Sequence, residues 1–246
     1  NFEYIWYATP NTEALKEIEP EIAEDQITQT YDVDVVVLGG GHAGLMATLG
    51  AVDEGCTVAT VEQQPWSAFV DLDGTGAADI ETGVGFFDHM LTAFSRHSLI
   101  DVTLRVKGDT YVDDHHTVED TGIVMGQALR EALGNKSGIR RFGSVMVPLD
   151  EALVMAAVDC SGRGELFWDV PIGPQKVGTF DTELGHEFFA GLARDAGITL
   201  HLRLVCGENA HHILEATFKA AARALREAVE PDPRSDGSVP STKGSL

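Results

Sequence analysis

The spacing of apolar residues changes along the chain, and the changes predict a series of strands and helices. Short alternating or continuous apolar runs predict strands, and longer runs with apolar residues three and four positions apart predict helices. After residue 66 the predicted elements are strands at 67–72, 76–81 and 101–107 with helices at 86–97 and 117–133, then strands at 144–148, 152–160 and 199–205 with helices at 182–196 and 211–229.

The order strand, strand, helix, strand, helix therefore occurs twice. His89 and His115 are 26 positions apart in the first copy, and His186 and His211 are 25 positions apart in the second. Such near-equal spacing predicts an internal repeat. We expect an α+β fold of two similar half-domains related by a pseudo-twofold axis, with the sheets on one side and the helices on the other. The expected division is 66–140 for the first half, 141–230 for the second and 231–246 for a tail.

A different pattern precedes the repeat. An acidic extension, 1–30, leads into residues 31–65, which read as strand, glycine turn, helix and strand. Gly39, Gly41 and Gly44 would allow a tight turn and a close approach to a pyrophosphate, and Glu62 follows the second strand, where a ribose hydroxyl would bind. The segment predicts a partial Rossmann-like βαβ unit. It resembles the amino-terminal FAD-binding unit of flavoproteins of the fumarate reductase type.

FAD binding is not expected in spite of that likeness, because a flavin needs the further strands of a doubly wound sheet, and the pattern stops at about residue 64. We therefore favour a truncated or fused remnant over a working cofactor site.

The net charge excludes two classes of binding partner. The chain carries 39 acidic and 17 basic residues, a formal charge of −22. That charge repels phosphate backbones and anionic membranes, so neither nucleic acid nor a membrane is an expected partner. Three cysteines without a CxxC favour a reducing compartment, and the expected location is the cytoplasm.

Two similar stretches carry the candidate chemistry, DDHHTVED at 113–120 and NAHHILEA at 209–216. In each stretch, the first of two adjacent histidines and a glutamate lie four positions apart. Residues at that spacing share one face of a helix and could bind one metal ion, while the second histidine points about 100° away. Adding the two histidines that the repeat makes equivalent, the candidate metal ligands are His89, His115, His116, Glu119, His186, His211, His212 and Glu215.

Six imidazoles and two carboxylates suit Mn, Fe, Co, Ni or Zn, whereas Mg and Ca prefer oxygen alone. Eight ligands suggest two ions with about four protein ligands each. Such ions would keep open positions for a substrate, which is typical of catalytic sites.

The second part of the chain, from about residue 69 to 246, resembles the imidazoleglycerol-phosphate dehydratase family, the hydro-lyases of histidine biosynthesis. The matching stretches are LDGTGAADIETGVGFFDHML, DDHHTVEDTGIVMGQAL, RRFG, PLDEAL, NAHHILEATFKAAARALR and PSTKGSL. The resemblance implies that the eight candidate ligands bind two manganese ions per active site. It also implies that Arg141, Arg163, Ser241 and Lys243 hold the phosphate of a small phosphorylated imidazole. A large symmetric homo-oligomer with metal sites between subunits is implied as well.

The reaction implied is dehydration of imidazole glycerol phosphate to imidazole acetol phosphate. Two manganese ions, one on each ring nitrogen, would stabilise an imidazolate while a carboxylate moves protons. The family's acid-base glutamate, however, falls on Gln63, with Glu62 beside it and Asp150 as a weaker substitute. We expect metal and phosphate binding to survive and turnover to be weakened or lost.

Two other functions stay open at this point. One is an FAD-dependent oxidoreductase built on residues 39–62. The other is a catalytically silent metal-binding assembly protein.

Overall fold

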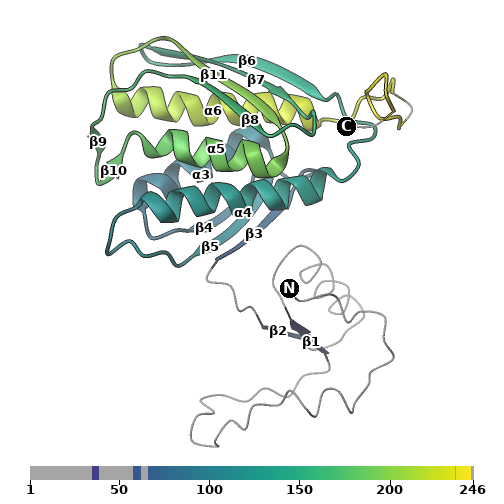
Figure 1. Ribbon diagram of the computed structural model, residues 1–246, viewed down its shortest axis with the longest axis horizontal. Coiled ribbons are helices and arrows are strands. Elements are labelled where there is room, and N and C mark those ends of the chain that lie inside the picture. The colour runs from purple at the N-terminus through teal and green to yellow at the C-terminus, as the bar shows by residue number, and fades with distance from the viewer. Residues whose placement is uncertain (1–34, 39–57, 62–65, 236, 245–246) are drawn as a thin grey trace, which may run out of the picture.

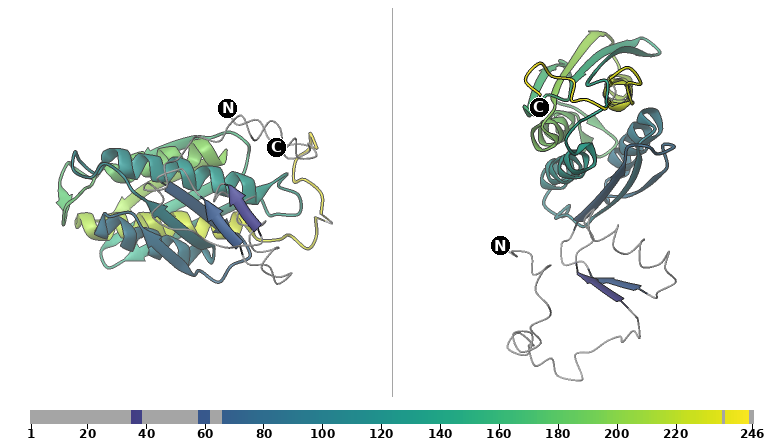
Figure 2. Two further views of the ribbon diagram at one scale, coloured as in Figure 1. Left: turned by 90° about the horizontal axis from the view of Figure 1, so that it is seen from below. Right: turned by 90° about the vertical axis from the view of Figure 1, so that its right-hand side faces the viewer.

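A three-stranded and a four-stranded sheet enclose a layer of helices in the computed structural model, which describes residues 35–38, 58–61, 66–235 and 237–244. Figures 1 and 2 show the sheets on opposite faces and the helices between them. The first half-domain consists of β3 (Trp66–Asp71), β4 (Ala78–Glu81), α3 (Gly85–Ser98), β5 (Asp101–Val106) and α4 (His115–Leu133). The second consists of β6 (Phe142–Leu149), β7 (Ala152–Asp159), β8 (Glu165–Asp169), β9 (Lys176–Val177), β10 (Phe180–Asp181), α5 (Leu184–Ala196), β11 (Thr199–Cys206) and α6 (Ala210–Val229).

Strand pairing shows how the two halves repeat. In the first sheet β3 runs antiparallel to β5, with Asp71 opposite Asp101, and β4 runs parallel to β5. In the second sheet β7 runs antiparallel to β11, with Asp159 opposite Thr199, and β8 runs parallel to β11. The sheet orders β3-β5-β4 and β7-β11-β8 are therefore equivalent, and β6 is an additional edge strand beside β7.

The repeat is thus present, but the predicted strands 144–148 and 152–160 do not correspond to the first two strands of the first half, because β7 corresponds to β3 and β8 to β4. The second half has three principal strands before its helix, because residues 165–169 form β8, which the sequence pattern did not predict. β8 is short, lies at a sheet edge and has no fully buried residue, so its apolar alternation is weak. No counterpart of β6 pairs with β3 in the described part of the chain.

The predicted layering also needs correction, because the helices lie between the sheets and not on one outer side (Figure 2). α6 shows why. It has thirteen buried residues, and it packs against β6 and β7 on one side and against α3 on the other. A helix buried on both sides needs a partner on each, and for α6 these are the second sheet and α3. α3 and α4 pack in turn on the first sheet, so the helices lie between the two sheets.

Aromatic residues fill the centre of the helical layer. Phe87, Phe180, Phe188 and Phe218 are fully buried, and their rings contact one another at centroid distances of 5.3 to 6.5 Å. This core joins α3 and α6 to α5 and to the β9–β10 hairpin. It fixes the helix ends that carry the candidate ligands.

Two short strands precede the repeat. β1 (Val35–Leu38) and β2 (Val58–Val61) pair in parallel. The glycine turn and the helical run predicted between them lie outside the described residues, as do Gly39, Gly41, Gly44, Glu62 and Gln63. The Rossmann-like unit therefore gains no support beyond one strand pair. Among the described helices, none is long and apolar enough to cross a membrane.

Candidate metal and phosphate sites

Both histidine pairs lie in the first turn of a helix. α6 follows Asn209, whose side-chain oxygen accepts hydrogen bonds from the backbone N–H groups of His211 (2.9 Å) and His212 (3.3 Å). At the start of α4, Asp113 Oδ1 accepts from the backbone N–H of His115 at 2.9 Å. Short polar side chains that satisfy these free N–H groups are favoured before a helix. The Asx residue two positions before each pair thus places the histidines at a helix end.

Three candidate ligands from α3 and α6 converge. One ligand atom each from His89, His211 and Glu215 lies within 4.8 Å of the other two. Nε2 of His211 is 3.1 Å from Oε2 of Glu215, and Nε2 of His89 is 3.8 Å from the same oxygen. Burial acts to raise the pKa of Glu215, but Lys219, whose Nζ lies 2.6 Å away, together with His211 and His89 outweighs it, so the pKa lies below its ordinary value. Two imidazoles and an ionised carboxylate are a donor set that suits manganese.

The equivalent residues in the other half are less closely gathered. Nε2 of His115 lies 3.8 Å from Oε2 of Glu119 on α4. His186 on α5 instead directs Nδ1 at Glu187 (2.9 Å), and its ring stands edge-on to Trp168. Within the described residues, three ligand atoms converge only in the first cluster.

The second histidine of each pair contacts a carboxylate that the sequence did not single out. Nδ1 of His116 lies 2.9 Å from Asp109 Oδ2, and Nδ1 of His212 lies 2.7 Å from Glu151 Oε2. The hydrogen bond with His116 lowers the pKa of Asp109. His212 and the backbone N–H of Asn209 lower the pKa of Glu151 to about 2. Both carboxylates are therefore ionised at neutral pH. Of the two carboxylates, only Glu151 lies inside one of the matching stretches, PLDEAL, so one weak indication of its role was present in the sequence.

Of the three acid-base candidates, Asp150 is described and the other two are not. Its side chain is exposed, its φ is +47°, and its Oδ2 lies 3.6 Å from Nε2 of His212. The two-residue turn between β6 and β7 accounts for this left-handed φ, and the approach to a candidate ligand is what favours a role for Asp150. Asp150 therefore stays a candidate on geometry. Glu62 and Gln63 lie outside the described residues.

The strand registers define what position 63 corresponds to in the second half. Asp71 and Asp159 occupy equivalent places in their sheets. Counting back the same eight positions from each leads to Gln63 and to Glu151. Position 63 is thus the repeat counterpart of a glutamate that contacts a candidate ligand.

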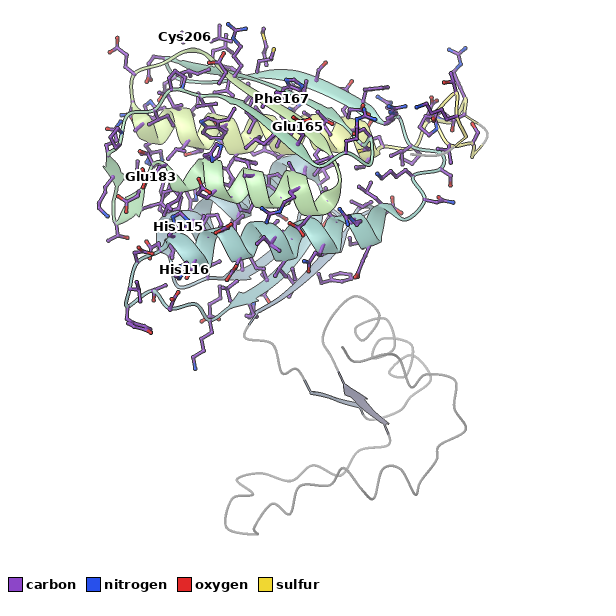
Figure 3. The ribbon with its side chains drawn as sticks, in the orientation of Figure 1. His115, His116, Glu165, Phe167, Glu183 and Cys206 are labelled. Carbon is purple, nitrogen blue, oxygen red and sulfur yellow. The ribbon has the colours of Figure 1, made fainter. Side chains whose placement is uncertain are left out.

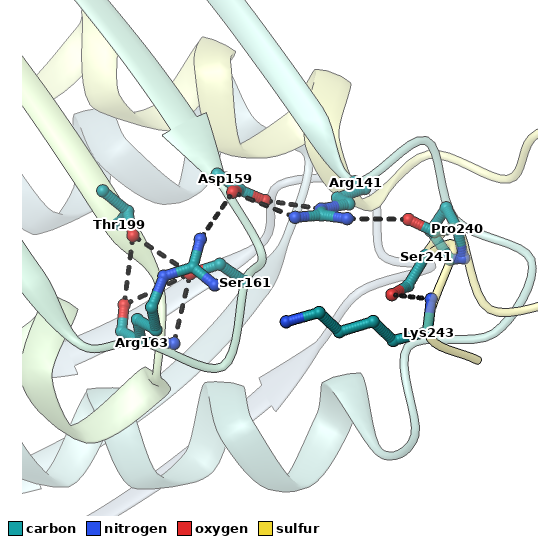
Figure 4. Close-up of polar contacts among 8 residues, drawn as sticks. All are labelled: Arg141, Asp159, Ser161, Arg163, Thr199, Pro240, Ser241 and Lys243. Atoms are coloured by element: carbon teal, nitrogen blue, oxygen red, sulfur yellow. Dashed lines mark hydrogen bonds and ion pairs between the residues drawn. The ribbon is translucent and has the colours of Figure 1, made fainter. Parts of the chain in front are cut away.

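All four predicted phosphate-binding residues line one cavity of about 640 Å³. Figure 4 shows them around the ends of β6 and β7 and the C-terminal tail. The cavity is lined by Arg141, Ser161, Arg163, Pro240, Ser241, Thr242 and Lys243. Three cationic side chains in one cavity would attract a phosphate strongly. Ser161 and Thr242 were not predicted.

Asp159 holds the arginines of this cavity (Figure 4). Arg141 donates from Nε to Asp159 Oδ1 at 2.7 Å and from Nη2 to Oδ2 at 3.2 Å. Its Nη1 donates to the carbonyl oxygen of Pro240 at 2.8 Å, which fastens the tail. Arg163 reaches the same carboxylate at 3.4 Å. The hydrogen bonds with Asp159 raise the pKa of Arg141 above its ordinary value.

The candidate ligands and the cavity lie at opposite ends of the helical layer (Figures 1 and 3). His115 and His116 are at the end near β9 and β10, and the tail is at the other end (Figures 1 and 3). Arg141 donates its backbone N–H to the carbonyl oxygen of Ala228, near the last turn of α6, whereas His211 is in the first turn. Ala228 is 17 positions after His211, which along a helix is about 26 Å.

Comparisons with known proteins show which protein family this chain resembles. The sequence model of the family described as imidazoleglycerol-phosphate dehydratase matches residues 82–225. An imidazoleglycerol-phosphate dehydratase of Cereibacter sphaeroides is 62% identical over 180 residues, covering 73% of this chain and 92% of that protein. One of Paracoccus denitrificans is 64% identical over 177 residues, covering 72% and 91%.

Two solved structures agree. The imidazoleglycerol-phosphate dehydratase of Staphylococcus aureus superposes with a TM-score of 0.65 at 41% identity, covering 69% of this chain and 96% of that one. The enzyme of Pyrococcus furiosus, solved in complex with (S)-C348, gives 0.61 at 37% identity, covering 76% and 99%.

The fold and these relatives define an enzyme of the carbon–oxygen hydro-lyase class. More particularly, the chain belongs to the imidazoleglycerol-phosphate dehydratase family of histidine biosynthesis.

Proposed function

We propose that the chain dehydrates imidazole glycerol phosphate to imidazole acetol phosphate in the cytoplasm, with two manganese ions in each active site, and that Gln63 slows this turnover. The observation that carries the metal part is the convergence of His89, His211 and Glu215. By the repeat, His186, His115 and Glu119 would form the second three-ligand set. His116 and His212 would each complete a set as a fourth ligand.

Manganese on the two ring nitrogens would withdraw charge from the imidazole as its side chain loses a carbon-bound proton. The chain's own residues hold the other end of the substrate. Arg141 is already fixed by Asp159 and Pro240 and keeps two guanidinium N–H groups for a phosphate. Arg163 and Lys243 are exposed and can close on the same anion.

Proton transfer is the step that this sequence weakens. A carboxylate can accept the carbon-bound proton and return one to the leaving hydroxyl, but the amide of Gln63 cannot. Asp150 is the described carboxylate best placed to substitute, because it lies beside Nε2 of His212. We therefore expect residual turnover.

The active site would be shared between chains. The candidate ligands and the phosphate cavity of one chain lie about 26 Å apart along α6, much farther than the length of one phosphorylated imidazole. One substrate can contact both kinds of site only if a neighbouring chain supplies one of them. This separation supports a homo-oligomer with metal sites at the interfaces.

Metal stoichiometry tests the proposal. The chain should be stripped with a chelator, dialysed against manganese and assayed for bound metal by mass spectrometry. We expect about two manganese ions per chain. A His89→Ala, His211→Ala double variant should keep about one. A stoichiometry near zero for the unmodified chain would contradict the proposed metal sites.

A silent metal-binding assembly protein is the alternative that Gln63 motivates. It shares the metal and phosphate sites and differs only in making no product. A dehydratase assay on the unmodified chain distinguishes the two, because slow product formation supports the proposal and complete absence of product supports the alternative. The Gln63→Glu variant, which should turn over in either case, shows that the rest of the active site is complete.

A further inference from the structure

The two histidine pairs share a second feature beyond the ligands themselves. In each pair the second histidine points Nδ1 at a carboxylate from a different element. Asp109 lies in the loop between β5 and α4, and Glu151 lies in the turn between β6 and β7. The first histidines, His115 and His211, instead direct Nε2 toward a glutamate on their own helix. The same division of roles thus occurs in both halves.

A carboxylate at Nδ1 decides which ring nitrogen is free for a metal. An ionised carboxylate accepts only, so Nδ1 must carry the proton and the lone pair of the neutral ring lies on Nε2. The contact also fixes the rotation of the ring. Such carboxylate-histidine pairs typically orient metal-binding imidazoles, and losing the carboxylate weakens metal binding.

We propose that Asp109 and Glu151 are positioning residues that hold His116 and His212 with Nε2 presented to manganese. This inference rests on the proposed function, since it takes these histidines as ligands. The two carboxylates reach their histidines from unequal places, one from before the helix and one from the neighbouring hairpin. The two halves therefore make the same carboxylate–histidine contact through different segments of the chain.

The contact between Asp109 and His116 also bears on the role of position 63. Gln63 is the repeat counterpart of Glu151, but the histidine equivalent to His212 is His116, and Asp109 already occupies Nδ1 of His116. A carboxylate at 63 is therefore not needed to orient a ligand. We expect Gln63→Glu to change turnover and leave manganese affinity unaltered, whereas Asp109→Asn should change affinity.

Manganese titration of the metal-free full-length chain, by calorimetry or by the loss of the free-ion electron paramagnetic resonance signal, tests this inference. Asp109→Asn and Glu151→Gln should each weaken manganese binding by about 10- to 100-fold. Asp109→Glu, which keeps the charge, should recover part of the loss. Glu151 also accepts backbone N–H groups of Glu208 and Asn209, so Asp109 gives the cleaner result.

Two matched controls remove the same charge close by. Asp120 is on α4 and Glu208 precedes α6, and neither side chain makes a hydrogen bond among the described residues. Asp120→Asn and Glu208→Gln should keep the affinity within about threefold. Equal affinity in the unmodified chain, Asp109→Asn and Glu151→Gln would overturn the inference alone. Failure of the unmodified chain to bind manganese would overturn the proposed function and the inference with it.

Discussion

Asp159 is a carboxylate beside a cavity proposed for an anion. Its own charge repels a phosphate, but it holds Arg141 through two hydrogen bonds and contacts Arg163. The side chains of Asp159 and Arg141 are largely buried, 19% and 16% exposed, so this pair is better defined than a surface ion pair. We interpret Asp159 as fixing the guanidinium groups in the geometry that a phosphate needs.

Asp159→Asn should therefore weaken phosphate binding. An amide accepts from only one oxygen and would leave Arg141 misoriented, which we expect to raise the Kd for inorganic phosphate about tenfold. Calorimetric titration of the metal-free chain measures it. Asp169→Asn, which removes a carboxylate paired with Arg203 on the same sheet, is the control and should change little. Equal or tighter phosphate binding in Asp159→Asn would show that repulsion outweighs positioning.

Cys160 and Cys206 should differ in reactivity. Burial raises the pKa of the Cys160 thiol to about 12, and the side chain is inaccessible, whereas Cys206 is exposed. At pH 8 the fraction of Cys160 present as the reactive thiolate is therefore very small. Iodoacetamide followed by peptide mass mapping should label Cys206 and spare Cys160 until denaturant is added. Equal labelling of both in the native chain would contradict the buried position.

At the residue scale the sequence supplied the chemical groups but not their partners. Histidine and arginine side chains inside long motifs could be named in advance, and the three-ligand cluster and the cavity bring several of them together. Asp109, Glu151 and Asp159 could not, because their contacts with His116, His212 and Arg141 join loops, turns and strand ends whose approach no sequence periodicity predicts. Only the folded strand registers and turns reveal those contacts.

At the scale of elements, α4 and α5 approach closely through glycines. A Cβ atom added to Gly122 would lie 2.3 Å from the carbonyl oxygen of Phe188, and one added to Gly126 would lie 2.8 Å from that of Leu192. Backbone atoms cannot move aside as a flexible side chain can. The contact therefore depends on glycine in spite of its low helix propensity.

Gly122→Ala should lower the free energy of unfolding by about 2 kcal/mol, because the overpacking cost exceeds the roughly 1 kcal/mol that alanine gains in helix propensity. Urea unfolding of the metal-free chain measures the change. Gly85→Ala, in the first turn of α3 with no neighbouring atom within 4 Å of its added Cβ, is the control and should stay within about 0.5 kcal/mol. Equal stability of the two variants would refute the close contact.

Periodicity predicted the four described helices to within about two residues at either end, because each has a long apolar stripe. It failed for β8 and for the β9–β10 hairpin, since strands of two to five residues at an edge have too few buried positions to show a pattern. The prediction of how sheets and helices are layered was wrong for another reason. A periodic stripe shows that a helix is buried, but not which sheet covers it.

At the scale of the whole molecule the two halves are alike in fold and unlike in charge. In the first half, Asp71 is equivalent to Asp159, and Asp73, two residues after the strand end, is equivalent to Ser161; Asp101 is paired opposite Asp71. Three carboxylates exclude an anion there. Each chain should thus supply one phosphate site, and phosphate titration should give a stoichiometry of about one.

Manganese should also control assembly. If metal sites join chains, mass photometry should show large particles with manganese and smaller species after chelation. A strict monomer under both conditions would contradict shared sites.

The most direct test is the turnover of imidazole glycerol phosphate by the metal-stripped chain, measured beside its Gln63→Glu variant with and without added manganese. Our account predicts slow manganese-dependent formation of imidazole acetol phosphate by the unmodified chain and a large increase in the variant. Product formation without manganese, or a Gln63→Glu variant that binds manganese and phosphate but makes no more product than the unmodified chain, would contradict it.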